Sequence, residues 1–467
     1  MVFASITFLW IFLPAVLILY YLLQVWKKQK MQNFLLLFAS LLFYSFGEPR
    51  LILLLLCCVL ANYLGGLIIA GSKKLTVRTL ALTVTLAMSL GMLGYFKYFN
   101  FFIDAMNSLT GMSLSVKRIA LPIGISFYTF QALSYTIDLY RGRCEVQRSF
   151  WKLLLYISFF PQLIAGPIVR YRDIADEIDD RSVSFDLMTE GISRFISGLG
   201  KKVLLANVFA VRADLIFSMP DAERTPALAW VGVLMYSMQI YFDFSGYSDM
   251  AIGMGRMFGF HFLENFNMPY TAQSITEFWR RWHISLSTWF KEYLYIPLGG
   301  NRKGNIRTCI NLLIVFFLTG LWHGAGWNFI AWGMLHGLLI VLERLLRANV
   351  KVSGTQAGRI AGHVYTLLAV SLAWIFFRAE SITAALGYFK TLVTPARQVW
   401  SVMEILETKG LFVTLIGILM CGIIPGELQK SLRESVWFKA AVLPILLFLC
   451  IMYLAADSYN PFIYFRF

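Results

Sequence analysis

Long apolar runs recur along nearly the whole chain, and they constrain its fold more than any other feature. Several are close to 20 residues long, the length at which a helix crosses the hydrocarbon core of a bilayer. We therefore expect an all-α polytopic membrane protein with roughly eleven transmembrane helices, some of the shorter runs being re-entrant or interfacial helices. The runs are 3–23, 33–47, 51–71, 79–99, 119–139, 150–169, 190–218, 228–258, 308–322, 327–346, 358–378, 408–425 and 438–456.

Composition and charge agree with a bilayer environment. Hydrophobic residues make up 58% of the 467 and charged residues only 14%, against about 25% charged residues in an ordinary soluble domain. The net charge of +15 comes with basic clusters after the first, third and fifth runs, as the positive-inside rule predicts for a chain whose N-terminus is outside. Because no soluble domain is evident to carry a basic face, we expect no nucleic-acid partner.

Polar interruptions are short, so we expect one integral-membrane domain over residues 1–467, with its catalytic core region at 260–340. The segment 261–307 is the most polar long stretch, yet it is rich in aromatic residues. Ser274 with Glu277 three residues later predicts a helix start. We expect that helix to continue past Trp289, in the interface or along a water-accessible cavity, until the turn at 297–301.

His323 is the strongest candidate for chemistry. It ends the run 308–322 in the sequence Gly-Leu-Trp322-His323-Gly-Ala-Gly-Trp-Asn328. A lone histidine at a helix end is more often structural, but glycines on both sides allow a substrate or a second backbone to approach closely. Polar groups at membrane depth are costly and are functional candidates by default.

Other polar groups accompany it in the sequence. His283, in Trp279-Arg280-Arg281-Trp-His283, is either an interfacial residue or a second member of the same site. Asp243 and Asp249 lie inside the run 228–258 and need partners. They either pair internally with arginines that fix helix packing or form the wall of a polar tunnel.

Competing catalytic signatures are absent. The sequence holds no GxSxG elbow, no HExxH, no complete phosphate loop and no dinucleotide fingerprint. No spacing supports a metal triad of His283, His323 and His336, so we expect no metal.

Several motifs, in order, resemble the membrane-bound O-acyltransferase family, and the resemblance covers most of the chain. They are Phe160–Arg170, Tyr241–Asp249, Glu264–Tyr270, Phe278–His283, Tyr295–Asn301 and Leu321–Gly324. Within the family the chain is most similar to the bacterial branch that includes alginate O-acetylation proteins, and its ending Ser458–Phe467 is similar to that branch too. The branch that transfers D-alanine to teichoic acid is a cousin.

The resemblance implies a ring of helices around a central tunnel, with the family's catalytic histidine at His323 and its second site residue at His283. It also implies a multi-pass protein of the bacterial inner membrane that takes an acyl group from a cytosolic thioester, acetyl-CoA or an acyl carrier. The eventual acceptor would be an exported polysaccharide, reached through a separate periplasmic or extracellular acetyltransferase.

A thioester is already electrophilic, so the enzyme needs a base for the acceptor hydroxyl and donors for the developing oxyanion. We assign the base to His323, and expect His283 or Asn328 to orient the acceptor or to stabilise the oxyanion. Trp322, Asp243 and Asp249 would line the tunnel. Arg280 and Arg281 would attract a phosphate-bearing donor or contact anionic lipid. D-alanyl transfer to a cell-wall polymer and a proton-coupled flippase for a lipid-linked sugar are the alternatives.

Overall fold

The computed structural model describes residues 2–26, 28–349 and 355–456, and the similar ending Ser458–Phe467 lies outside the described residues. Every regular element in the described part is helical, as expected. Nine of its helices are long and apolar enough to cross a membrane. They include Gly304–His323, which contains 308–322, one of the shorter apolar runs. The expected count of eleven stays a prediction.

The chain divides into two compact units, which we describe separately. Unit 1 comprises Met1–Phe195 and Tyr247–Leu263, and unit 2 comprises Ile196–Gly246 and Glu264–Phe467. The expectation of a single domain is not tested by this division and remains a prediction.

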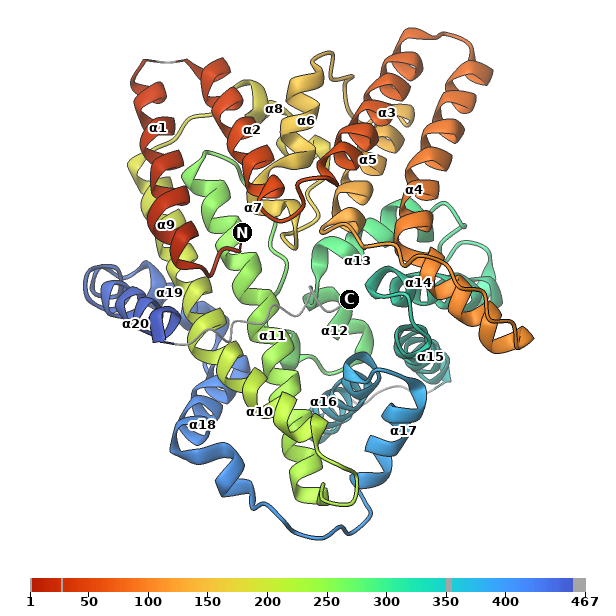
Figure 1. Cartoon of the computed structure of the whole chain (residues 1–467), viewed down its shortest axis with the longest axis vertical. Helices are drawn as coiled ribbons and strands as arrows, with labels where there is room; N and C mark the ends of the chain where they lie inside the picture. The colour runs from red at the N-terminus through yellow and green to blue at the C-terminus, as the bar shows by residue number, and fades with distance from the viewer. Residues whose placement is uncertain (1, 27, 350–354, 457–467) are drawn as a thin grey trace. The chain divides into compact units, whose positions relative to one another are not determined.

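Unit 1 holds the N-terminal helices, coloured red to yellow in Figure 1. Its elements are η1 (Phe8–Phe12), α1 (Leu13–Val25), α2 (Gln29–Ser45), α3 (Ile52–Gly71), α4 (Leu75–Thr110), α5 (Ile125–Tyr140), α6 (Phe150–Ser158), α7 (Phe160–Leu163) and α8 (Tyr171–Asp179), with parts of α9 (Phe185–Gly200) and α11 (Pro226–Met257).

Helices α3, α4 and α5 pack against one another through a small-residue seam and a buried amide. A Cβ atom at Gly65 would lie 2.1 Å from Thr85 Oγ1, so only glycine permits this approach of α3 to α4. Asn62 of α3 donates to Ser89 Oγ at 2.9 Å and accepts from Thr136 Oγ1 at 2.7 Å. Inside lipid the hydrophobic effect does not drive helices together, so their association depends on close packing at small residues and on interhelical hydrogen bonds.

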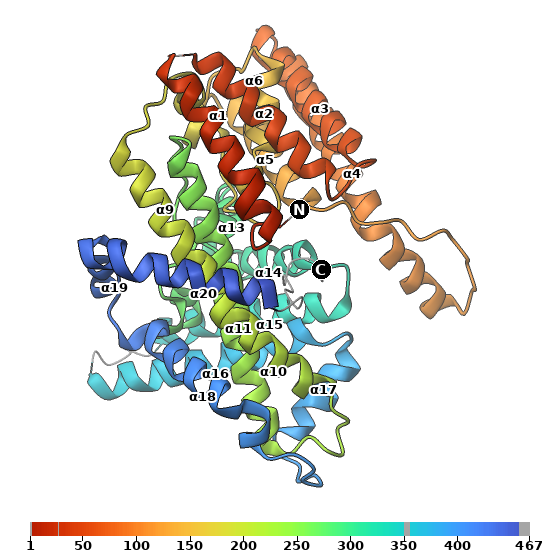
Figure 2. The same cartoon turned by 60° about the vertical axis from the view of Figure 1, so that its left-hand side comes forward.

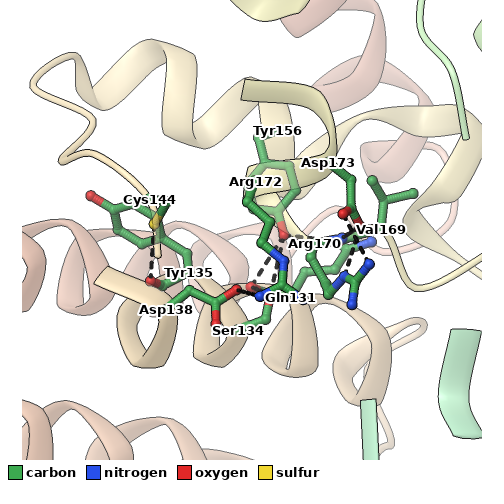
Figure 3. A network of polar contacts seen from close by, with 10 residues as sticks. All are labelled: Gln131, Ser134, Tyr135, Asp138, Cys144, Tyr156, Val169, Arg170, Arg172 and Asp173. Carbon is green, nitrogen blue, oxygen red and sulfur yellow. Dashed lines mark hydrogen bonds and ion pairs between the residues drawn. The ribbon is translucent and has the colours of Figure 1, made fainter. Parts of the chain in front are cut away.

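The first family motif, Phe160–Arg170, is held in unit 1 by a polar network (Figure 3). The Tyr156 hydroxyl donates to the Val169 carbonyl at 2.8 Å, and Arg170 pairs with Asp173 at 2.8 Å. Arg172 reaches from α8 to the buried Asp138 of α5 at 3.4 Å. The contact of Tyr156 satisfies a backbone carbonyl of the motif, and the ion pairs tie the end of the motif to α8 and α8 to α5.

Unit 2 holds most of the C-terminal half of the chain. Within it α18 packs against α10, as Figure 2 shows. Its elements are η2 (Lys201–Ala206), α10 (Asn207–Ser218), η3 (Pro269–Thr271), α12 (Ile275–Arg281), α13 (Ile284–Phe290), η4 (Lys291–Tyr295), α14 (Gly304–His323), α15 (Trp327–Asn349), α16 (Gln356–Arg378), α17 (Ile382–Thr391), α18 (Val402–Ile418), η5 (Leu419–Ile423), α19 (Gly426–Glu434), η6 (Phe438–Val442) and α20 (Leu443–Ala456), with the remainder of α9 and α11.

Two glycines bring α14 and α15 into backbone contact. A Cβ atom at Gly320 would lie 2.4 Å from the carbonyl oxygen of Phe329, and one at Gly333 would lie 2.3 Å from that of Phe316. Any other residue at these positions would force the helices apart. This close pair positions the C-terminal end of α14, where His323 lies.

Candidate active site

His323 is the last residue of α14 and lies in an aromatic enclosure. Its side chain is buried, and its ring centroid is 4.9 Å from that of Trp322, 5.1 Å from Trp332 and 5.2 Å from Phe377. All three rings meet the imidazole edge to face, at interplanar angles of 74–89°. Such packing fixes the plane of the imidazole through aromatic contacts rather than through charged groups.

His283 lies at a break between two short helices. Helix α12 ends at Arg281, α13 begins at Ile284, and His283 between them has φ +44° and ψ +54°. The prediction of one continuous helix past Trp289 is therefore wrong, although its start at Ser274, whose Oγ accepts from the Glu277 amide, is confirmed. Left-handed backbone in a residue other than glycine persists only where the surroundings hold it.

Asn265 supplies the surroundings that hold this break. The Ile284 amide donates to the Asn265 carbonyl at 2.9 Å, and the Asn267 amide donates to the Arg281 carbonyl at 2.9 Å. The side-chain oxygen of Asn265 lies 3.2 Å from His283 Nδ1. The segment 265–267 therefore runs beside the break and fixes both the backbone and the ring of His283.

The fold brings His283 and His323 together although they lie forty positions apart. Their ring centroids are 6.4 Å apart, and Trp322 lies 5.8 Å from the His283 ring. Phe244 of α11 closes the other side of His283 at 4.6 Å, perpendicular to it. One buried aromatic cluster of unit 2 thus contains three of the candidate residues from the sequence, His283, Trp322 and His323.

Sequence reasoning did not assign a role to His336, which extends this aromatic cluster. It is fully buried, accepts at Nδ1 from Trp279 Nε1 at 3.2 Å, and lies one turn after Trp332 on α15. The Trp332 ring is 5.1 Å from both His323 and His336. Within the part of the chain that the structure describes, no three His, Cys, Asp or Glu side chains form a group suited to a metal ion.

A cavity of about 650 Å³ lies between α12, α13, η4, α14 and α15 in unit 2. Its wall includes Thr319, one helical turn before His323, and Trp279, the partner of His336. Arg280, Lys291 and Arg344 add positive charge to its lining. Its size is typical of small-molecule sites. Its lining combines an apolar wall with three cations and one carboxylate, Glu343, which accepts hydrogen bonds from the start of α12.

The two arginines of α12 have different surroundings. Arg280 is exposed and lines the cavity. Arg281 instead pairs with Glu277 one turn earlier at 2.8 Å and contacts the Asn267 carbonyl. Glu277 also accepts from the Gln273 amide at 2.9 Å. Arg281 is therefore committed to the start of α12, while Arg280 is available to a ligand.

The two carboxylates inside α11 both have basic partners. In unit 2, Asp243 pairs with Lys202 at 2.8 Å, and both side chains are almost fully buried. In unit 1, Asp249 pairs with Arg194 at 2.8 Å. Internal pairing was one of the two interpretations of these residues, although the partner of Asp243 is a lysine. Their place in a tunnel wall stays a prediction.

Asn328 lies near the end of a neighbouring helix. Its side-chain nitrogen donates to the carbonyls of Ala379 at 2.8 Å and Phe376 at 3.4 Å, at the C-terminus of α16. Carbonyls at a helix end lack intrahelical donors, and this amide satisfies two of them. These contacts give the Asn328 side chain a structural role at the end of α16. Its expected role toward the substrate stays a prediction.

Comparison with known proteins identifies the class to which this chain belongs, an acyltransferase of the membrane. Residues 5–383 match the membrane-bound O-acyltransferase family, and the chain belongs to that family.

Its relatives include acetyl-transferring proteins of several bacteria. The chain is 40% identical over 496 residues to the probable alginate O-acetylase AlgI of Pseudomonas putida, with 100% of each chain covered. It is 46% identical over 393 residues to that of Azotobacter vinelandii, covering 82% of this chain and 76% of the relative. It is 34% identical over 510 residues to the peptidoglycan O-acetyltransferase of Helicobacter pylori, covering 98% and 96%.

Proposed function

We propose that this chain moves an acetyl group from a cytosolic thioester across the bacterial inner membrane for O-acetylation of an exported polysaccharide such as alginate. Two observations support this proposal. The rings of His323 and His283 lie close together in one buried aromatic site, and the chain is similar over its full length to a probable alginate O-acetylase. Acetyl-CoA or an acetylated carrier protein is the donor. A separate periplasmic or extracellular acetyltransferase completes the transfer to the polymer.

In this proposal His323 is the general base. As the acceptor hydroxyl attacks the thioester carbonyl, His323 takes its proton, the carbon–oxygen bond forms, and the carbon–sulfur bond breaks. The departing thiolate then receives the proton that His323 holds, which restores the neutral imidazole. A base of this kind typically contributes about 10²–10⁴-fold to the rate, and imidazole has the intrinsic pKa suited to it.

The cavity beside α14 is the proposed path of the donor. Arg280, Lys291 and Arg344 would bind the phosphates of coenzyme A or phosphopantetheine. The apolar wall would receive the pantetheine arm as far as Thr319, one turn from His323. We propose further that roughly eleven helices cross the bilayer and surround a central tunnel, with Trp322, Asp243, Asp249 and Asn328 near it.

The test is acetylation of polysaccharide in a bacterial host that lacks its own membrane acetylase but has the periplasmic enzyme and the polymer. The wild-type chain should restore ester-linked acetyl groups, and His323→Ala should abolish them at equal protein level. His261→Ala is the matched control, because His261 is an exposed histidine of unit 1 that pairs with Glu177. Full acetylation by His323→Ala would refute the proposed role.

The acceptor is resolved by the same host with different polymers. Acetylated alginate with unmodified peptidoglycan supports the proposal. Acetylation of peptidoglycan alone would instead assign the activity named for the Helicobacter pylori relative. Mass spectrometry of the released acyl group separates acetyl from D-alanyl transfer.

A further inference from the structure

The side-chain oxygen of Asn265 lies at the centre of three polar contacts. It accepts from the Ser285 backbone amide at 3.2 Å and from the Ser285 hydroxyl at 2.9 Å, and it lies 3.2 Å from His283 Nδ1. A backbone amide can only donate a hydrogen bond. The atom that faces it must therefore be the oxygen of the Asn265 amide, and the orientation of this amide is fixed by the backbone.

This orientation decides where His283 carries its proton. An amide oxygen only accepts, and the Ser285 hydroxyl, 3.5 Å from Nδ1, gives its proton to the same oxygen, so Nδ1 of His283 donates at this contact. In a neutral imidazole a proton on Nδ1 leaves a lone pair on Nε2. The hydrogen bond made by one ring nitrogen thus sets the chemistry of the other.

His283 Nε2 is buried and has no hydrogen-bond partner among residues 2–26, 28–349 and 355–456. Its ring is fully buried, with Phe244 at 4.6 Å, Trp322 at 5.8 Å and His323 at 6.4 Å. Burial lowers the pKa of His283 to about 3, so the ring is neutral at physiological pH. A buried acceptor without a partner is costly unless a ligand supplies the donor.

We propose that Asn265 is a positioning residue that holds His283 in its Nδ1–H tautomer, so that Nε2 accepts a hydrogen bond from the bound acceptor. This inference rests on the proposed function and decides between two roles for His283. It orients the acceptor by accepting a hydrogen bond from a donor group other than the hydroxyl that His323 deprotonates. It does not stabilise the oxyanion, because Nε2 has no proton to donate.

The direct test is the tautomer of His283 in the full chain, reconstituted in lipid nanodiscs and labelled with ¹⁵N-histidine. His283→Asn identifies the resonances by their loss. The inference expects a protonated Nδ1 and an unprotonated Nε2 in the wild-type protein. A protonated Nε2 with a bare Nδ1 would overturn it. This readout uses the folded wild-type protein and does not depend on the stability of any Asn265 variant.

Kinetics of Asn265 variants supply the second test. Asn265→Leu removes the accepting oxygen, and we expect kcat/KM for the acceptor to fall at least tenfold, about the effect of losing one 1.4 kcal/mol interaction, with the donor KM unchanged. Asn265→Asp keeps an accepting oxygen and adds a negative charge that favours the imidazolium. It should retain more activity than Asn265→Leu, and the acid limb of its pH profile should move to higher pH.

Asn267→Ala is the matched control, because the side chain of Asn267 is exposed in the same segment. It should leave both constants near their wild-type values. Equal rises of donor and acceptor KM in Asn265→Leu, with no shift of the pH profile in Asn265→Asp, would show a merely structural role. Retained transfer by His323→Ala in the same assay would instead refute the proposed function, whatever the tautomer of His283.

Discussion

The imidazole rings of His283 and His323 lie 6.4 Å apart, at an interplanar angle of 62°, and they come from different elements. His323 is placed by the close contact of α14 with α15, whereas His283 is placed by a left-handed break that Asn265 holds. The backbone of each ring is thus held by different contacts, although Trp322 packs against both rings. Substitutions at Gly320 and at His283 therefore act on different backbone contacts.

Replacing His283 should have different consequences for activity and for folding. Asparagine tolerates the left-handed backbone that His283 adopts, while alanine is strained there. We expect both His283→Asn and His283→Ala to lower acyl transfer by about 10²-fold, because each removes the group that positions the acceptor. Only His283→Ala should also lower the melting temperature, measured by thermal unfolding in nanodiscs. Equal melting temperatures with unequal activities would contradict this account of the break.

Gly320→Ala should displace the end of α14. The added methyl group would lie 2.4 Å from the Phe329 carbonyl oxygen, so α14 must move away from α15. Overpacking of this kind costs about 1–3 kcal/mol, and a shift of about 1 Å in a catalytic group lowers rates on the order of 10²-fold. Gly91→Ala is the control, because nothing lies within 4 Å of a Cβ atom there. A fully active Gly320→Ala protein would refute the positioning role of this contact.

Removing one partner of the buried ion pair Lys202–Asp243 should lower the free energy of unfolding more than replacing both partners does. Asp243→Asn leaves the Lys202 ammonium without this carboxylate, and breaking a buried pair costs about 3–5 kcal/mol. The double variant Lys202→Met with Asp243→Asn should recover part of that loss, as a double-mutant cycle measures. Asp104→Asn, in an exposed pair with Arg118, should cost no more than about 1 kcal/mol. Additive losses in the cycle would contradict the coupling.

Positive charge at the cavity should act on the phosphates of the donor. The double variant Arg280→Gln with Lys291→Gln should raise the KM for acetyl-CoA about tenfold, since a charge-assisted hydrogen bond contributes about 1.5–3 kcal/mol. It should leave the KM for an acetyl thioester without phosphates unchanged. Arg359→Gln, at a different cavity of unit 2, is the control. Equal changes for both donors would show that these cations do not bind phosphate.

Much of this architecture follows from local sequence. The apolar runs predict the membrane helices because each must bury its own backbone polar groups in lipid, and Ser274 predicts the start of α12 because its cap is local. The break at His283 could not be predicted, since it depends on backbone hydrogen bonds to Asn265 and Asn267, which are distant in the sequence. A continuous helical pattern was the local preference, and tertiary contacts overrode it.

The partners of the site residues show the same limit. Lys202 follows Gly198, Gly200 and Lys201 in the sequence, and nothing local connects it to Asp243. Trp332 and Phe377 enclose His323 from α15 and α16, where they read as ordinary apolar residues. Asn265 lies within the motif Glu264–Tyr270, but only the structure shows that it faces His283.

The most direct measurement of the central claim is the initial rate of acetyl transfer from a labelled acetyl thioester to alginate by the purified chain in nanodiscs, with the periplasmic acetyltransferase supplied. Wild type, His323→Ala and His261→Ala would be compared after each is shown to have the same melting temperature. The account predicts that His323→Ala loses about 10²–10⁴-fold in rate while His261→Ala stays at the wild-type rate. A folded His323→Ala protein that transfers acetyl groups at the wild-type rate would contradict it.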